Sequence, residues 1–156
     1  MEFGIFAWGG LSTNKLKCII NLQKKCVRNV AHKSYNSHTD PIFKELNILK
    51  FHDLFKLNCS VFMYKYCHGL QPLTFKDMFT PCNNNDRTGD YKLKLCKTHF
   101  LDRFPSVFLP KYWNENSQNI KHAMSLKSLK SQINTYYINH YNKFRKCDSP
   151  FCLDCN

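Results

Sequence analysis

The sequence of 156 residues has little glycine (5) and proline (6) and no long apolar run. So few turn-forming residues exclude collagen-like and low-complexity chains. No stretch approaches the roughly 18 apolar residues of a membrane-spanning helix, so we expect no transmembrane segment. The apolar residues 1–11 lack the basic region and the cleavage site of a signal peptide. We therefore expect an intracellular protein, nuclear or cytoplasmic, that is not secreted.

The sequence also lacks the patterns of the common catalytic sites. Its 11 acidic residues are scattered with no adjacent pair, whereas two-metal polymerases and nucleases need clustered carboxylates. Walker A loops, nucleophile elbows and dinucleotide-binding glycine patterns are missing. Cys67 and His68 are neighbours, but adjacent side chains on a helix point about 100° apart and make a poor dyad. We identify no catalytic residue.

Positive charge is abundant. The chain has 23 Lys and Arg against 11 Asp and Glu, a formal net charge of +12. A surplus of this size favours polyanionic partners, nucleic acid first and an acidic membrane surface second. However, lysine supplies most of the cations, and Asn, Phe, Tyr and Ile are also frequent. AT-rich codon usage produces the same composition without any partner, so both explanations stay open.

Hydrophobic periodicity predicts a mostly α fold, a small helical domain with an irregular linker and a Cys-containing C-terminal tail. Helical spacing covers residues 12–32, 40–46, 51–68 and 125–144. Asp40 and Pro41 fit an N-cap and a first helical position. In residues 93–109 alternating leucines indicate a short strand, and Pro105 and Pro110 oppose a long helix. We divide the chain into a helical region (1–79), an exposed linker (80–98), a second helical segment (99–146) and a Cys-rich tail (147–156).

Two basic segments are candidates for binding nucleic acid. The helix predicted over residues 12–32 has an apolar stripe, and its other face carries Lys15, Lys17, Lys24, Lys25 and Arg28. Near the C-terminus, Lys143, Arg145 and Lys146 interleave with aromatic residues, a pattern that suits stacking on single-stranded nucleic acid. The structural alternatives are a solvated helix face for the first segment and core-packed rings for the second.

Cysteine is frequent and odd in number, with nine residues. Cys147, Cys152 and Cys155, with His140 upstream, form a Cys3His set that could hold one structural zinc. The alternative is a reduced terminus without metal, and we predict no other cofactor. Cys18 and Cys26, like Cys59 and Cys67, are eight residues apart. We interpret these two pairs as buried small apolar residues.

Several segments resemble one protein family, the jockey-like non-LTR retrotransposon reverse transcriptases. Residues 38–46 (HTDPIFKEL), 53–57 and 62–65 resemble the region that follows the polymerase core of this family. Residues 3–9 (FGIFAWG) resemble its aromatic-Gly-Ile-x-x-Trp-Gly motif near the end of the thumb. Lys25 to Arg28 lies where the family has a basic helix, and weaker similarities are found at Trp113-Asn114 and at Leu129-Lys130. The resemblance extends over about residues 3–144 and is strongest up to residue 79.

This resemblance implies that the parent protein is an RNA-directed DNA polymerase, whose catalytic palm would precede this chain. The chain itself is then a C-terminal fragment that does not polymerise alone. Its partners would be single-stranded RNA or DNA, or a template-primer, together with the upstream polymerase domain, and no membrane. The alternatives are a small helical protein-interaction module, with or without a zinc-tied tail, and a non-functional transposon remnant.

Overall fold

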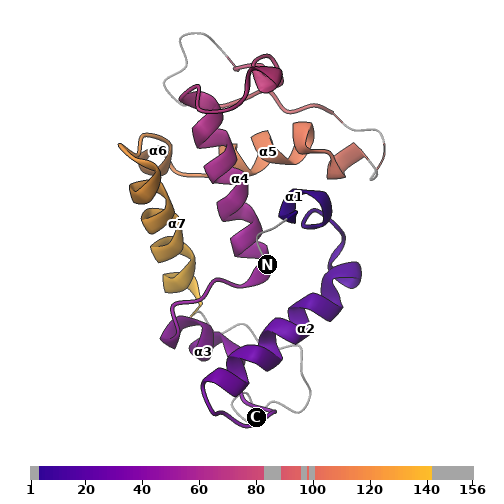
Figure 1. The fold of residues 1–156 in the computed structure, drawn as a ribbon, viewed down its shortest axis with the longest axis vertical. Helices are drawn as coiled ribbons and strands as arrows, with labels where there is room; N and C mark the ends of the chain where they lie inside the picture. Colours follow the sequence, from indigo (N-terminus) through magenta and orange to yellow (C-terminus); the bar gives the residue numbers. More distant parts are fainter. Residues whose placement is uncertain (1–3, 83–88, 96–97, 99–100, 142–156) are drawn as a thin grey trace. The chain divides into compact units, whose positions relative to one another are not determined.

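In the computed structural model, the described residues are 4–82, 89–95, 98 and 101–141. They are mostly helical, which confirms the predicted fold class (Figure 1). The α-helices are α1 (Ile5–Trp8), α2 (Thr13–Val30), α3 (Thr39–Glu45), α4 (Phe51–Cys67), α5 (Pro105–Asn114), α6 (Gln118–Lys121) and α7 (Leu126–His140). Short 3-10 helices cover Leu73–Phe75 and Leu101–Arg103. The chain divides into two compact units, Met1–Leu11 with Leu54–Ile133, and Ser12–Asp53 with Asn134–Asn156.

The two longest predicted helices are present. Helix α2 lies within the predicted residues 12–32, and α4 ends one residue before the predicted end. Gly69 follows α4 with a φ of 66°, the left-handed conformation that we expect of a glycine at this position. The inward side of α4 was predicted only in part. Phe55 and Tyr64 are buried as predicted, whereas the buried row follows Phe55, Cys59 and Met63. The other residues predicted to point inward are half-buried: Leu54, Leu57, Val61, Phe62 and Tyr66. Apolar residues surround this helix over so wide an arc that the sequence does not locate the buried row.

The start of α3 differs from the prediction. The N-cap residue is His38 rather than Asp40, and its Nδ1 accepts a hydrogen bond of 3.2 Å from the backbone N–H of Asp40. Thr39 and Asp40 are therefore the first two helical residues, and Pro41 is the third. Histidine was overlooked because serine, threonine, aspartate and asparagine are the usual N-cap residues.

Helix α5 corrects the expectation for residues 93–109. Pro105 begins a helix of 10 residues, and Pro110 lies inside it. Pro110 removes one backbone hydrogen bond, but it is buried beside Phe108, Leu109 and Trp113. Burial of this apolar group offsets the lost bond. The predicted strand does not form, since Leu93 and Leu95 are exposed and Tyr91 pairs with Pro81 in an isolated antiparallel bridge.

Helix α7 begins near the predicted residue 125 and buries Leu129 and Ile133 as expected. Tyr141 is buried as expected. Tyr136 and Tyr137 were predicted as alternatives for one inward position; Tyr136 is 53% exposed and Tyr137 is half-buried. Of the lysines predicted on other faces, Lys127 and Lys130 are exposed. The predicted last residues of this helix, 142–144, lie outside the described residues.

Aromatic rings form the core of the first unit. Phe6 of α1 contacts Phe62 of α4 and Phe108 of α5, at ring-centre distances of 5.6 and 6.4 Å. Phe55 contacts Phe108 at 5.2 Å. Helices α1, α4 and α5 thus share one core (Figure 1). The apolar segment that carries the aromatic-glycine motif therefore packs inside the first unit.

Side-chain hydrogen bonds to the backbone hold the second unit together. Helix α2 packs against α3, and the buried amide of Gln23 donates to the carbonyl of Leu49 and accepts from the N–H of Phe51, each at 2.9 Å. Tyr141 accepts a hydrogen bond from the N–H of Lys50 and donates one of 2.6 Å to Asp53. These contacts attach residues 49–53, at the start of α4, both to α2 and to Tyr141, the residue after α7.

Candidate nucleic-acid interface and pocket

The five cations predicted on α2 all reach solvent. Lys15, Lys17 and Lys25 are exposed, and Lys24 and Arg28 are partly exposed. No acidic residue occurs between Phe3 and Thr39 in the sequence. Within the described residues, none of the four lysines forms an ion pair. The positive charge of α2 is therefore not neutralised by neighbouring side chains of the described chain.

The cations do not share a single face of α2. With about 100° per residue, Lys17, Lys24 and Arg28 lie in one row on one flank of the buried stripe formed by Leu16, Gln23 and Val27. By the same geometry Lys25 lies roughly opposite the stripe, and Lys15 lies about 160° from the row. The prediction of one basic face was therefore too simple. A ligand on the row reaches Lys17, Lys24 and Arg28, with Lys25 at its border.

Arg28 has a structural role as well as a positive charge. Its Nε donates a hydrogen bond of 2.9 Å to the carbonyl of Ser37, and its guanidinium carbon lies 5.9 Å from the ring centre of Tyr35. The turn after α2 is thereby fastened to the helix. Tyr35 is 72% exposed, so an aromatic ring stands in solvent beside the cation row. Tyr35 lies outside both the apolar periodicity and the basic run, so no sequence pattern marks it as a binding residue.

The helix N-terminus increases the positive potential around Lys15 and Lys17. Ser12 is the N-cap residue, makes no side-chain capping bond, and no acidic residue occupies the first turn. Lysines near the positive end of the helix dipole are unfavourably placed by about 0.3–1 kcal/mol each at low salt. A bound anion relieves this repulsion.

Most of the tail residues lie outside the described residues. This holds for the predicted nucleic-acid ligands Lys143, Arg145 and Lys146 and for the predicted zinc ligands Cys147, Cys152 and Cys155. His140 is described, is exposed at the end of α7, and its Nδ1 lies 2.6 Å from the carbonyl oxygen of Tyr136. Over residues 4–82, 89–95, 98 and 101–141, no three His, Cys, Asp or Glu side chains come together as a metal site.

The other cysteines were only partly predicted. Cys59 is fully buried in α4, as expected of a small apolar residue. Cys18, Cys26 and Cys67 are exposed, which contradicts the interpretation of both pairs as buried. On α2, Cys18 and Cys26 lie away from the buried stripe, and the spacing of eight alone does not show which face of the helix is covered.

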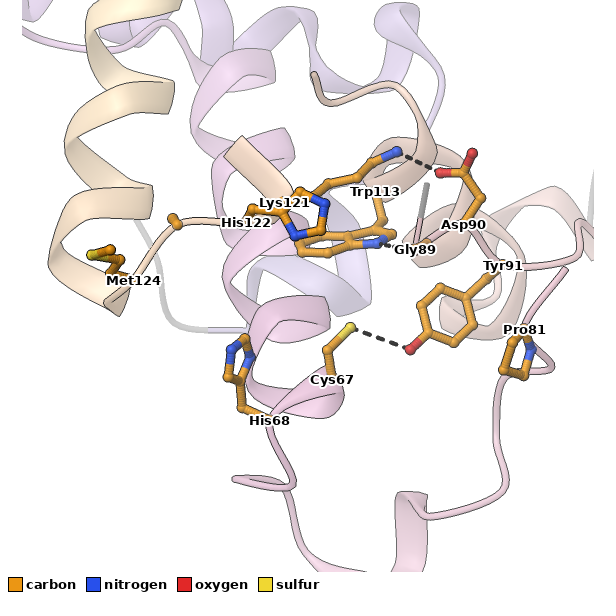
Figure 2. Close-up of a pocket in the computed structure, with 11 residues that line it drawn as sticks. Cys67, His68, Pro81, Gly89, Asp90, Tyr91, Trp113, Lys121, His122 and Met124 are labelled. Atoms are coloured by element: carbon orange, nitrogen blue, oxygen red, sulfur yellow. Dashed lines mark hydrogen bonds and ion pairs between the residues drawn. The ribbon is translucent and has the colours of Figure 1, made fainter. Parts of the chain in front are cut away.

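The first unit contains a pocket of about 760 Å³ beside Trp113 (Figure 2). Its lining includes Cys67 and His68 at the end of α4, Asp90 and Tyr91, and Lys121 and His122 at the end of α6. Figure 2 shows the ammonium of Lys121 directed at the carboxylate of Asp90. No sequence pattern marks these residues as one binding group, since they come from three segments that are far apart in the chain.

Helix α5 and a short bridge hold one wall of this pocket in place. The N–H of Cys82 donates to the carbonyl of Asp90, and that of Lys92 donates to the carbonyl of Thr80. Trp113 Nε1 donates a hydrogen bond of 2.9 Å to the carbonyl of Gly89. Residues 89–91 are thus bonded both to residues 80–82 and to the end of α5. Within the predicted linker, this gives Asp90 and Tyr91 defined and half-buried positions.

The thiol of Cys67 and the hydroxyl of Tyr91 are 3.2 Å apart on the same wall. Cys67 as a whole residue is exposed, but the protein around its thiol removes part of the solvent and so raises the pKa of the thiol. Burial raises the pKa of Tyr91, and the hydrogen bond with Cys67 raises it further. Both groups are therefore neutral at physiological pH. The Cys67 thiol is a poor nucleophile in this state, since the thiolate is the reactive form.

None of the helices in the described part of the chain combines the length and the apolar character that crossing a bilayer requires. The sequence was compared with protein-family models and with curated proteins, and the fold with solved structures. None of these comparisons found a match.

Proposed function

We propose that this chain is the nucleic-acid-binding region that follows the polymerase core of a jockey-like non-LTR retrotransposon reverse transcriptase. In this proposal it binds single-stranded RNA or DNA through α2 and leaves the chemistry to the parent polymerase. The observation that carries the proposal is the cation row on α2, within a stretch of the sequence that holds no acidic residue. The similarity of residues 3–9 and 38–65 to the family supplies the identity of the parent.

The arrangement on α2 suits a phosphate backbone. Lys17 and Lys24 are seven residues apart in the row, about 10 Å along the helix axis. Neutralising phosphates releases counterions, and this release provides the main driving force for binding nucleic acid without sequence preference. Since no carboxylate competes for these lysines among the described residues, their full charge is available to the ligand.

Tyr35 extends the interface from phosphates to bases. Its exposed ring lies against Arg28 at the end of the row. Stacking of a base on an exposed aromatic ring contributes about 1–3 kcal/mol and accepts any base. Single strands offer free base faces and duplexes do not, so this side chain favours a single-stranded ligand.

A salt titration combined with charge reversal tests the proposal. Binding of a single-stranded oligonucleotide through three lysines should weaken roughly twentyfold between 50 and 200 mM salt, because each contact contributes about 0.7 to the logarithmic slope. The triple variant Lys17→Glu, Lys24→Glu, Lys25→Glu should abolish most of this binding. The control variant Lys111→Glu, Lys127→Glu, Lys130→Glu changes the same charge on exposed lysines of other helices.

Equal losses in the two triple variants would show that only net charge matters, which contradicts a site on α2. Affinity that does not change with salt would contradict phosphate contact altogether. Tyr35→Ala adds a second comparison, because it should weaken binding to a single strand more than binding to a duplex of the same sequence.

A helical protein-interaction module is the second candidate. Leu22 and Val30 on α2 are 54% and 63% exposed, whereas Leu16 and Val27 of the same helix are buried. A zinc-tied tail would support such a module, and His140 fits this role. Its Nδ1 is engaged with the carbonyl of Tyr136, which leaves Nε2 for a metal, the usual second contact of a ligating histidine.

A further inference from the structure

Lys121 is unusually deep for a lysine. Its side chain is only 4% exposed, and its ammonium pairs with the carboxylate of Asp90, whose side chain is 29% exposed. Buried ion pairs are weak stabilisers, because the cost of removing two charges from water offsets their attraction. An apolar pair of similar volume would stabilise the fold at least as well. Both residues line an open pocket, where their polar groups are within reach of a bound molecule.

The pair still has hydrogen-bonding capacity. The Lys121 ammonium has three N–H groups, and the two acceptors for them are the Asp90 carboxylate and the carbonyl of Asn114 at 3.4 Å. The third N–H of Lys121 and the Oδ2 atom of Asp90 have no partner within the described residues. The pocket thus offers a donor and an acceptor side by side.

These groups restrict the class of ligand. An anion would be repelled by Asp90 and a cation by Lys121, so an uncharged ligand fits the pair best. To bond with both Lys121 and Asp90, this ligand must carry a hydrogen-bond acceptor next to a hydrogen-bond donor on one edge of the molecule. Tyr91, Trp113 and the imidazoles of His68 and His122 add flat side chains to the lining (Figure 2). A pocket of about 760 Å³ is large enough for a planar heterocycle and its sugar.

We propose that this pocket binds a single unstacked nucleobase. Lys121 donates to a ring nitrogen or carbonyl oxygen of the base, and Asp90 accepts from the neighbouring N–H. Nucleobases are flat and neutral and carry such donors and acceptors on their edges. The inference rests on the proposed function, in which a nucleic acid supplies the base. Free nucleosides carry no phosphate, so they test the pocket separately from α2.

The two tryptophans of the chain provide the measurement. The indole N–H of Trp113 is bonded to Gly89 in the pocket wall, whereas Trp8 lies in α1 and does not line the pocket. Adenosine, guanosine, cytidine and uridine are each titrated to about 1 mM into the full chain. We expect at least one of them to shift the Trp113 indole NMR signal saturably and to leave the Trp8 signal in place. No shift with any nucleoside, or an equal shift with inorganic phosphate, would overturn the proposal.

Two variants locate the binding. Lys121→Met should weaken nucleoside binding about tenfold, and the matched control Lys127→Met, an exposed lysine of α7, should not. Should Lys121→Met unfold, His122→Ala removes an exposed pocket residue and should weaken binding severalfold. Unchanged affinity in both pocket variants would overturn the proposal. The α2 variant separates the pocket from the proposed function. If it loses oligonucleotide binding and keeps the nucleoside-induced shift of Trp113, the pocket and α2 are two separate sites. If it keeps oligonucleotide binding, the proposed function of α2 is wrong and the pocket proposal is unaffected.

Discussion

The side-chain amide of Asn114 forms both of its hydrogen bonds with the backbone of one residue, Tyr91. Its Oδ1 accepts from the Tyr91 N–H at 3.1 Å, and its Nδ2 donates to the Tyr91 carbonyl at 2.8 Å. The amide therefore pairs with Tyr91 as a neighbouring β-strand would. The preceding residue, Trp113, bonds to Gly89. Trp113 and Asn114 together attach residues 89–91 to α5.

Replacing Asn114 by leucine should loosen this attachment. Asn114→Leu leaves a half-buried N–H and carbonyl of Tyr91 without a partner, which we expect to lower the free energy of unfolding by about 1–3 kcal/mol. Urea unfolding measures the loss, and hydrogen exchange at the Tyr91 amide should accelerate. Asn119→Leu, on the exposed side of α6, is the matched control and should change stability by less than about 0.5 kcal/mol. An unchanged exchange rate at Tyr91 would contradict the role of Asn114.

Substitution by alanine should change the stability of the protein very differently at the two adjacent glycines after α1, Gly9 and Gly10. A Cβ atom on Gly9 would collide with the carbonyl oxygen of Ile5 and the ring of Phe55, whereas one on Gly10 would meet no atom closer than 3.7 Å. Gly9→Ala should therefore destabilise the protein by about 1–3 kcal/mol through overpacking. Gly10→Ala should be close to neutral. Thermal unfolding of both variants checks this, and equal stability would show that α1 does not pack against Phe55.

Stability should fall at alkaline pH because of Cys59. Burial raises the pKa of this thiol well above its ordinary value of 9.0. Above about pH 9 the unfolded chain releases this proton and the folded chain retains it, so stability is complete below that pH and decreases as the pH rises. The expected slope is about 1.4 kcal/mol per pH unit for each such thiol.

Urea unfolding between about pH 8 and pH 10 measures the onset of this loss, which reaches about 1.4 kcal/mol at pH 10 because the full slope applies only above the ordinary pKa of 9.0. Cys59→Ala should reduce it by the contribution of one group, although the cavity also lowers stability at every pH. Cys18→Ala replaces an exposed cysteine and is the matched control, which should show the same slope as the unsubstituted chain. A slope that is the same in all three proteins would show that Cys59 does not titrate differently in the folded state.

Zinc content tests the proposed tail site. Protein purified under reducing conditions should contain about one zinc ion per chain if His140, Cys147, Cys152 and Cys155 bind it. Cys152→Ser should lose the metal, and the control Cys26→Ser on α2 should retain it. If the purified protein contains no zinc and is as stable as the protein with added zinc, the tail does not bind zinc as a structural metal.

Local patterns in the sequence were sufficient for α2, α3, α4 and α7, but not for α1, α5 and α6. Side-chain spacing and backbone preference act within one or two turns of helix. They account for the apolar periodicity of α2, the length of α4 and the end of α4 before Gly69. The basic character of α2 is equally local. The spacing alone places Lys17, Lys24 and Arg28 in one row. Where this row lies relative to the buried stripe of Leu16, Gln23 and Val27 was decided by packing.

Tertiary structure decided the remaining features, because they depend on partners far apart in the sequence. Gln23 is a polar residue in a basic helix, and its burial is explained only by the backbone of Leu49 and Phe51. Lys121 would be expected on the surface, and its ion pair with Asp90 requires residues 89–91 to be held against α5. The composition and periodicity of the sequence determined a basic, mostly helical chain. Long-range packing placed Lys121 and Asp90 together, since no local rule relates residues 31 positions apart.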